Sequence, residues 1–333
     1  MKQPKSYGTT LKLLVLVVVC CTISINLIPI HANPISSIEF NQAVDAAMYD
    51  VVSSSTFQQY VTNVIGFLVV PICPTKVEYP SRWPVSSSIS ELKMCYDGSS
   101  YIPQPWPQIY HEVGNRLMDA LNKHYQMTMK AKFVPLVMNE SLGYFENMKF
   151  AVESGQCDVA VADTTYTEER ATKVKFSACP YGVTMNAFLR TDLDNTTLTG
   201  INELKHLNHS GINVTYYEGS VFETIAQENL QAATKFPTNY DNQYTLIRQR
   251  KVHAVIGDAL DQVTWLENNK KECVGCYIRT FGLGGKFGVF TEATNRTSGS
   301  NSFHQRFPKC NGLQFLSVMI LLMYVFVQAF EIL

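Results

Sequence analysis

Short apolar segments alternate with amphipathic helical segments from Glu91 to Phe290. Strands are expected at 92–96, 131–137, 159–162, 184–189, 212–217, 252–257 and 276–281, and helices at 109–125, 145–153, 201–207, 222–230, 242–250 and 260–269. An order of strand, helix and strand requires crossover connections, so it predicts an α/β fold with mixed, mainly parallel sheets and helices on both faces. The pattern starts afresh in the second half, which favours two lobes joined by two crossings.

The composition is that of a globular protein with a sizeable core. Of the 333 residues, 46% are hydrophobic and 17% are charged, and the formal net charge is -1. A nucleic-acid-binding protein needs a basic face, and this charge balance argues against such a partner.

The first 32 residues have the pattern of an export signal. Lys2 and Lys5 precede a mostly apolar run, Leu11 to Cys21, and Ile30-His-Ala32 is an acceptable cleavage site. A membrane anchor is the alternative, although the run is short for a membrane span.

Residues 301–333 have the pattern of a glycolipid (GPI) attachment signal. Small residues, Ser298 to Ser300, precede a polar spacer, and an apolar run from Leu313 to Leu333 comes after it. Ser300 is the expected attachment site, and a plain tail anchor is the alternative. Either alternative predicts a protein held on a membrane.

The cysteine count agrees with both processing predictions. Of nine cysteines, Cys20, Cys21 and Cys310 lie in the segments expected to be removed, which leaves an even number. Proximity in the chain alone suggests the pairs Cys73–Cys95, Cys157–Cys179 and Cys273–Cys276. Sequons at Asn139, Asn195, Asn208, Asn213 and Asn295 fit a secreted glycoprotein, although about three are expected by chance.

Several polar residues that suit a zwitterion come directly after the predicted strands. Arg170 can fork onto a carboxylate, and Thr165 can add a hydroxyl hydrogen bond. Gly219-Ser220-Val221 forms a strand-to-helix turn, where free N–H groups attract an anion. Asp258 ends a buried strand and suits an ammonium group. Aromatic candidates for packing on a ligand are Tyr101, Trp106 and Phe145.

Each of these features also has a purely structural explanation. An arginine after a strand is often a surface ion-pair partner, and a Gly-Ser turn is a common helix start. Their spacing in the sequence does not decide between the two explanations.

Enzyme and metal motifs are weak in this chain. There is no Gly-x-Ser-x-Gly or His-Glu-x-x-His sequence, and His206 and His209 fit exposed bystanders better than metal ligands. Cys273-Val-Gly-Cys276 has no second pair, so a local disulfide is favoured over zinc or redox chemistry. Glycines 282, 284 and 288 miss the dinucleotide-binding spacing and predict a flexible turn. No cofactor and no metal are expected.

Three short segments carry a family resemblance: Ser154-Gly-Gln-Cys-Asp-Val-Ala-Val-Ala162, Thr167-Glu-Glu-Arg170 and Phe176-Ser-Ala-Cys-Pro-Tyr181. Together they resemble the central signature of solute-binding protein family 3, bacterial amino-acid-binding proteins related to the ligand cores of ionotropic glutamate receptors. The likeness covers roughly 91–290. It implies the two-lobe, type II periplasmic-binding-protein fold, whose lobes close on an amino acid.

The resemblance also implies roles for single residues. Arg170 would hold the α-carboxylate with Thr165 and the N–H groups of Ser220 and Val221. Asp258 and the carbonyl of Asp163 would accept from the α-amino group. The chain departs from the family at Asp163, where a small or neutral residue is common, and at Val221, usually Thr or Ser. The additional acid suggests a cationic ligand.

The family's last helix, which packs back on the first lobe, has its counterpart before that lobe in this chain. Phe40 to Phe57 resembles that closing helix, so we expect 37–65 to pack on lobe 1 as the result of a circular permutation. A relic of a lost upstream repeat is the alternative. The expected lobes are 89–187 and 188–279, and 280–295 return to lobe 1.

The favoured function is extracellular, cell-surface binding of a small amino-acid-like solute, without chemistry. The alternative is a secreted dehydratase-like enzyme in the same cleft, with Asp163 or Glu168 as general acid. A channel-linked receptor is disfavoured, because no apolar run of pore-helix length lies between Ala187 and Cys276. The expected partners are the solute and the membrane, and a protein partner is left open.

Overall fold

The computed structural model describes residues 37–64, 68–99, 102, 104–139, 141–191 and 201–294. The expected export signal (1–32), the attachment segment (301–333) and Ser300 lie outside the described residues, as do Tyr101, Asn195 and Asn295. Among the described helices, none combines the length and the apolar character that a bilayer span requires.

The first sheet has the strand order β2-β1-β3-β10-β4. Its strands are β1 (Glu91–Asp97), β2 (Lys130–Leu136), β3 (Val159–Ala160), β4 (Val174–Phe176) and β10 (Phe290–Glu292). β1 pairs in parallel with β2 and β3, whereas β10 runs antiparallel between β3 and β4. The carboxyl ends of β1 and β3 therefore meet at one edge, where the residues after them come together.

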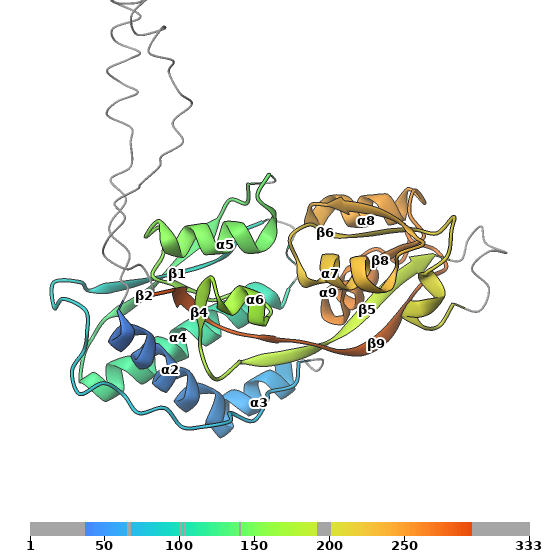
Figure 1. Cartoon of the computed structure of the whole chain (residues 1–333). Coiled ribbons are helices and arrows are strands. Elements are labelled where there is room, and N and C mark those ends of the chain that lie inside the picture. Colours follow the sequence, from blue (N-terminus) through green and yellow to red (C-terminus); the bar gives the residue numbers. More distant parts are fainter. Residues whose placement is uncertain are drawn as a thin grey trace, which may run out of the picture. The chain divides into compact units, whose positions relative to one another are not determined.

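Helices cover both faces of this sheet (Figure 1). Leu92 and Met94 of β1 belong to the same buried cluster as the apolar stripe of α4 (Trp106–Tyr125). Cys95 points to the other face and belongs to the cluster of α5 (Gly143–Glu153). The alternation along β1 is a consequence of the two-residue period of a strand.

Helices α2 (Ile38–Ser53) and α3 (Ser55–Val64) extend the cluster around α4. Phe40 and Phe57 are fully buried there. Asn41 joins α2 to the end of β10, because its Nδ2 donates to the carbonyl of Glu292 (3.4 Å) and its Oδ1 accepts from the hydroxyl of Thr291 (2.6 Å). α2 and β10 are therefore neighbours in space, although they are far apart in sequence.

The second sheet repeats the arrangement with the order β7-β6-β8-β5-β9. Its strands are β5 (Gly182–Thr191), β6 (Asn213–Tyr217), β7 (Thr234–Thr238), β8 (Ala254–Asp258) and β9 (Cys276–Phe287), and its helices are α7 (Val221–Asn229), α8 (Tyr240–Arg248) and α9 (Ala259–Asn268), with a short 3-10 turn, η2 (Leu204–Leu207). β6 is parallel to β7 and β8, and β5 is antiparallel to β8 and β9. The expected α/β fold, with mixed sheets covered by helices, is confirmed.

The glycine-rich segment 282–288 was expected to be a flexible turn, and this prediction is wrong for most of it. β9 continues to Phe287, and its pairing with β5 shifts register twice, between Val183 and Met185 and between Asn186 and Ala187. Glycine allows such irregular strand geometry. At Gly285 it also allows a close approach, because a Cβ there would lie 1.8 Å from Cγ2 of Thr165.

Two of the three expected disulfide pairs are wrong. The structure pairs Cys73 with Cys179 and Cys95 with Cys157, while Cys273–Cys276 is as expected. Cys95 lies on β1 and Cys157 just before β3, its parallel neighbour, so the sheet brings them together across 62 residues. Proximity in the chain is therefore a poor guide, since partners in a parallel sheet are always separated by a crossover.

Phe40→Ala tests whether α2 belongs to the core of the first sheet. We expect a loss of about 3–5 kcal/mol in the free energy of unfolding, because the change leaves a cavity in a packed cluster. Urea unfolding at equilibrium measures it. Ile38→Ala on the same helix is the control, with Ile38 71% exposed. An equal, small effect of both changes would contradict the assignment of α2 to this core.

Candidate functional site

A pocket of about 60 Å³ lies where residues beyond the strand ends of both sheets meet. A buried water needs about 10–15 Å³ by this kind of measure, so the pocket has room for about four to six waters. Of the eight predicted ligand-binding residues, six line it: Asp163, Thr165, Arg170, Ser220, Val221 and Asp258. Tyr101 lies outside the described residues.

Arg170 is held in place by the short helix α6 (Glu168–Ala171), which begins after Thr167. Its guanidinium donates to the carbonyl of Thr165 (3.0 Å) and, across the pocket, to the carbonyl of Gly219 (2.9 Å). It also lies 4.7 Å from the ring centroid of Phe145. Phe145 therefore packs on the arginine and is not among the lining residues of the pocket.

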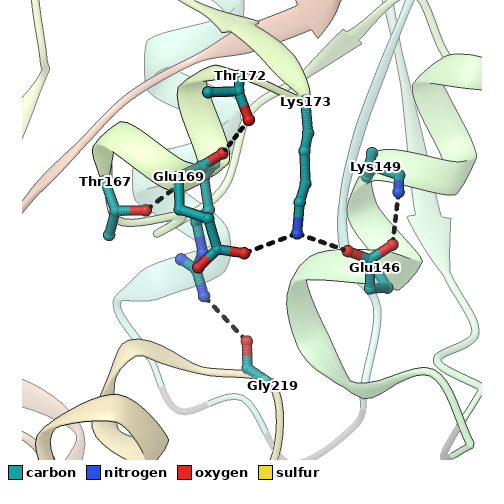
Figure 2. A network of polar contacts seen from close by, with 8 residues as sticks. Glu146, Lys149, Thr167, Glu169, Thr172, Lys173 and Gly219 are labelled. Atoms are coloured by element: carbon teal, nitrogen blue, oxygen red, sulfur yellow. Dashed lines mark hydrogen bonds and ion pairs between the residues drawn. The ribbon is translucent and has the colours of Figure 1, made fainter.

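An ion-pair network fixes α6 against α5 beside this arginine (Figure 2). Lys173 Nζ lies 2.8 Å from Oε1 of Glu169 and 3.6 Å from Oε1 of Glu146, which also pairs with Lys149 at 2.6 Å. These side chains are partly exposed, so the network adds little to stability. The network links α6, the helix that carries Arg170, to α5.

The Gly219-Ser220 turn brings the second sheet close to α5. Gly219 has a φ of +72°, and a Cβ there would lie 2.8 Å from the backbone nitrogen of Tyr144. That nitrogen donates to the carbonyl of Glu218 at 3.1 Å. Ser220 caps α7 by accepting from the N–H of Phe222 (3.3 Å), and the N–H of Gly219 donates to the Glu223 carboxylate (2.8 Å). The N–H of Ser220, which was expected to hold the α-carboxylate, donates to the carbonyl of Tyr217 at 3.2 Å. Part of the predicted anion-binding turn is thus already satisfied by the protein.

Asp258 has two local partners in addition to facing the pocket. Its Oδ1 accepts from the N–H of Leu260 at 2.9 Å, which caps α9, and its Oδ2 accepts from the hydroxyl of Thr184. Asp163 accepts from the hydroxyl of Tyr144 at 2.8 Å. Both acids line the pocket.

Two carboxyl groups that the sequence analysis did not identify also line the pocket. Asp97 is the last residue of β1. It could have been identified from the sequence, because ligands tend to lie at the carboxyl ends of parallel strands. Asp261 lies in the first turn of α9 and accepts from the indole N–H of Trp106 at 2.5 Å. Nothing in its sequence context distinguishes it from a surface residue of a helix.

Burial changes the protonation of these acids. Desolvation raises the pKa of Asp97 to about 6 and that of Asp258 to about 7, against hydrogen bonds that oppose the shift. Burial also raises the pKa of Asp163, and the pKa of Asp261 lies well above its ordinary value because of burial and of its neighbour Asp258. The pocket therefore retains protons close to neutral pH.

Comparisons with known proteins agree with the sequence signature. Residues 116–263 match the family model of bacterial extracellular solute-binding proteins, family 3. The resemblance to this family is confirmed. No curated protein matches the chain.

Solved structures similar to the chain include several with a bound amino acid. A putative transporter binding component from Wolinella succinogenes complexed with lysine has a TM-score of 0.49 and 14% identity, covering 64% of this chain and 85% of that chain. A substrate-binding protein, AbpA, from Streptococcus pneumoniae bound to L-arginine has a TM-score of 0.47 and 18% identity, covering 62% and 83%. The ancestral amino-acid-binding protein AncCDT-1, a precursor of cyclohexadienyl dehydratase, has a TM-score of 0.47 and 18% identity, covering 61% and 82%.

The raised pKa values predict how stability depends on pH. Between the ordinary carboxyl range near pH 4 and about pH 7, these acids bind more protons in the folded protein than in the unfolded chain. The contribution of these acids is therefore complete below about pH 4 and is lost as the pH rises through about 7. Asp258→Asn keeps an N-cap acceptor and removes one titrating group, so the fall in unfolding free energy from pH 5 to pH 8 becomes shallower.

Urea unfolding at several pH values measures this slope. The same substitution at exposed Asp119 is the matched control. A slope that Asp258→Asn leaves unchanged would contradict the assignment.

Proposed function

We propose that the protein binds a small amino-acid-like solute in the pocket between its two sheets, outside the cell. The observation that carries this proposal is the meeting of Arg170, Ser220 and Asp258 on one pocket, although they come from different sheets. An arginine suits the carboxylate of such a ligand, and a buried aspartate suits its amino group. The family match over 116–263 supports the same function.

The ligand's carboxylate would compete with protein groups for Arg170. The guanidinium hydrogen bonds to the carbonyls of Thr165 and Gly219, which are neutral acceptors. A carboxylate is the stronger acceptor, because charge-assisted bonds are shorter and about twice as strong. Replacing the Gly219 carbonyl also loosens the direct link between the sheets, so the solute would take over part of that link.

Location outside the cell is part of the proposal. The three disulfides of the described residues favour an oxidising compartment. Two sequon residues, Asn139 and Asn208, are exposed, as a glycosylation site must be. At a third sequon, the Nδ2 of Asn213 donates to the carbonyl of Lys251 (3.3 Å). Attachment to the cell surface through Ser300 is tested by phospholipase treatment of intact cells, which releases a GPI-anchored protein and leaves a tail-anchored one in place.

A dehydratase-like activity is a second candidate, favoured by one observation. Burial raises the pKa of Asp163, and a raised carboxyl pKa is a property that general acids share. One similar structure is that of AncCDT-1, a precursor of cyclohexadienyl dehydratase. This description applies to AncCDT-1 and not to the present chain. Turnover of the bound solute, measured by mass spectrometry, separates this candidate from binding alone.

Arg170→Lys tests the role of the guanidinium. Lysine keeps the charge and loses the planar fork, so we expect at least about tenfold weaker binding of the best amino-acid ligand. Calorimetry with the twenty amino acids identifies that ligand and measures the change.

The matched control is Arg82→Lys, the same substitution at an exposed arginine away from the pocket. Equal affinities for Arg170→Lys and the unaltered protein would rule out a carboxylate grip by Arg170. Absence of any ligand would refute the proposed function itself.

A further inference from the structure

The pocket contains many more acids than bases. Among the described lining residues, Asp97, Asp163, Asp258 and Asp261 carry carboxyl groups and Arg170 is the one cationic side chain. Arg170 uses its donors on the backbone carbonyls of Thr165 and Gly219. A zwitterion brings one positive and one negative charge, so it would leave this excess of acid unbalanced.

The donors that satisfy these acids are neutral. Asp163 accepts from Tyr144, Asp258 from Thr184 and the N–H of Leu260, and Asp261 from the indole of Trp106. Among the residues that the structure describes, none of the four acids forms an ion pair. Hydrogen bonds are thus largely provided by neutral groups, and Arg170 is the one cationic side chain among the described lining residues.

One carboxylate oxygen of Asp97 lacks a hydrogen-bond partner in the described part of the chain. The residue is 1% exposed, and its Oδ1 accepts from the N–H of Ser99 at 2.9 Å. Its Oδ2 is buried and has no hydrogen-bond partner within the described part of the chain. Leaving a buried carboxylate oxygen unsatisfied is costly, so a donor from a ligand suits this position.

The walls of the pocket favour an organic cation over a metal ion. Its aromatic lining comprises Trp106, Tyr144, Tyr217, Tyr240, Tyr244 and Phe222, with Phe287 next to them. Aromatic faces attract ammonium and guanidinium groups and pack on their carbon chains. Among the described residues no group of acids, histidines and cysteines has the arrangement of a metal site.

A second pocket of about 450 Å³ adjoins the first and shares Tyr217 and Tyr240 with it. Gly98 and Ser99, the two residues after Asp97, line it, and so do Glu218 and Asp241. Its described lining contains no lysine, arginine or histidine. The inner pocket of about 60 Å³ is small, so a ligand longer than a few atoms would extend into this neighbouring acidic space.

We propose that the solute carries a net positive charge, and that an ammonium or guanidinium group beyond its α-amino group lies against Asp97 and Asp163 inside the aromatic lining. This inference rests on the proposed function and names its class of ligand. Asp163 selects the charge of the ligand in this account.

Proton release should accompany binding of such a cation. Burial holds the pKa of Asp97 at about 6 and that of Asp258 at about 7. The charged groups that face Asp97 are Asp163 and Asp241, and those that face Asp258 include Asp163 and Asp261, all acidic. A bound cation favours the ionised form of each acid, so affinity should rise between pH 5.5 and pH 8.

Calorimetry with the full chain tests the inference with four probes. Lysine and norleucine differ in the side-chain ammonium group alone, cadaverine has two ammonium groups and no carboxylate, and glutamine is a neutral polar control. We expect lysine to bind at least about tenfold more tightly than norleucine, a factor typical of one charge-assisted contact. Runs in buffers of different ionisation enthalpy then report the released protons.

Asp163→Asn is the decisive variant, because asparagine keeps an acceptor for Tyr144 and removes the charge. It should weaken lysine binding at least about tenfold and leave norleucine binding nearly unchanged. Asp97→Asn provides a second, independent variant, and Asp119→Asn, an exposed site, is the matched control. Circular dichroism and melting temperature establish that each variant is folded.

The outcomes separate the inference from the function on which it rests. Tight binding of lysine with or without binding of cadaverine supports the inference, and the cadaverine result decides whether the ligand is a basic amino acid or an amine without a carboxylate. Norleucine or glutamine binding as tightly as lysine, or an unchanged preference in Asp163→Asn, overturns the inference and leaves the proposed function intact. Failure of every amino acid and amine to bind overturns both.

Discussion

The antiparallel pairing of β5 with β9 is the constraint on which the site depends. Both connections between the sheets run through this pair, and the pairing begins where they enter the second sheet, at Gly182 opposite Phe287. Because the two connections lie side by side, the carboxyl-end edges of the two sheets face one pocket. Arg170 and Gly219 can then bond directly, although one comes after β3 and the other after β6. Gly285, in β9, allows Thr165 to approach this pair closely.

Much of this arrangement could be predicted from the sequence, because it depends on local periodicity. The alternation of apolar runs and amphipathic helices located most elements to within a few residues. Arg170, Ser220 and Asp258 were found because parallel strands place the residues at their carboxyl ends along one edge of the sheet. The signature around Arg170 then indicated the family, and the match over 116–263 confirmed that resemblance.

The remaining features depend on contacts that local periodicity does not contain. β7 (Thr234–Thr238) was missed because its sequence, Thr-Lys-Phe-Pro-Thr, has little apolar alternation, and it is an edge strand. The disulfide partners depend on which strands are neighbours in the sheet, and the crossovers decide that order. Asp261 is recognised as a pocket residue only once Trp106 is seen to reach it from α4, a helix packed on the first sheet. Its burial and its partner are both properties of the folded pocket.

The bond network between Asn41 and the end of β10 has a mechanical consequence. Asn41 lies near the start of the described chain, and Thr291 and Glu292 lie near its end. Tension applied between these two points is carried by α2, β10 and the core that they share, and it does not pass along β5 or β9. The load path between these two points therefore runs through the first sheet and excludes the second.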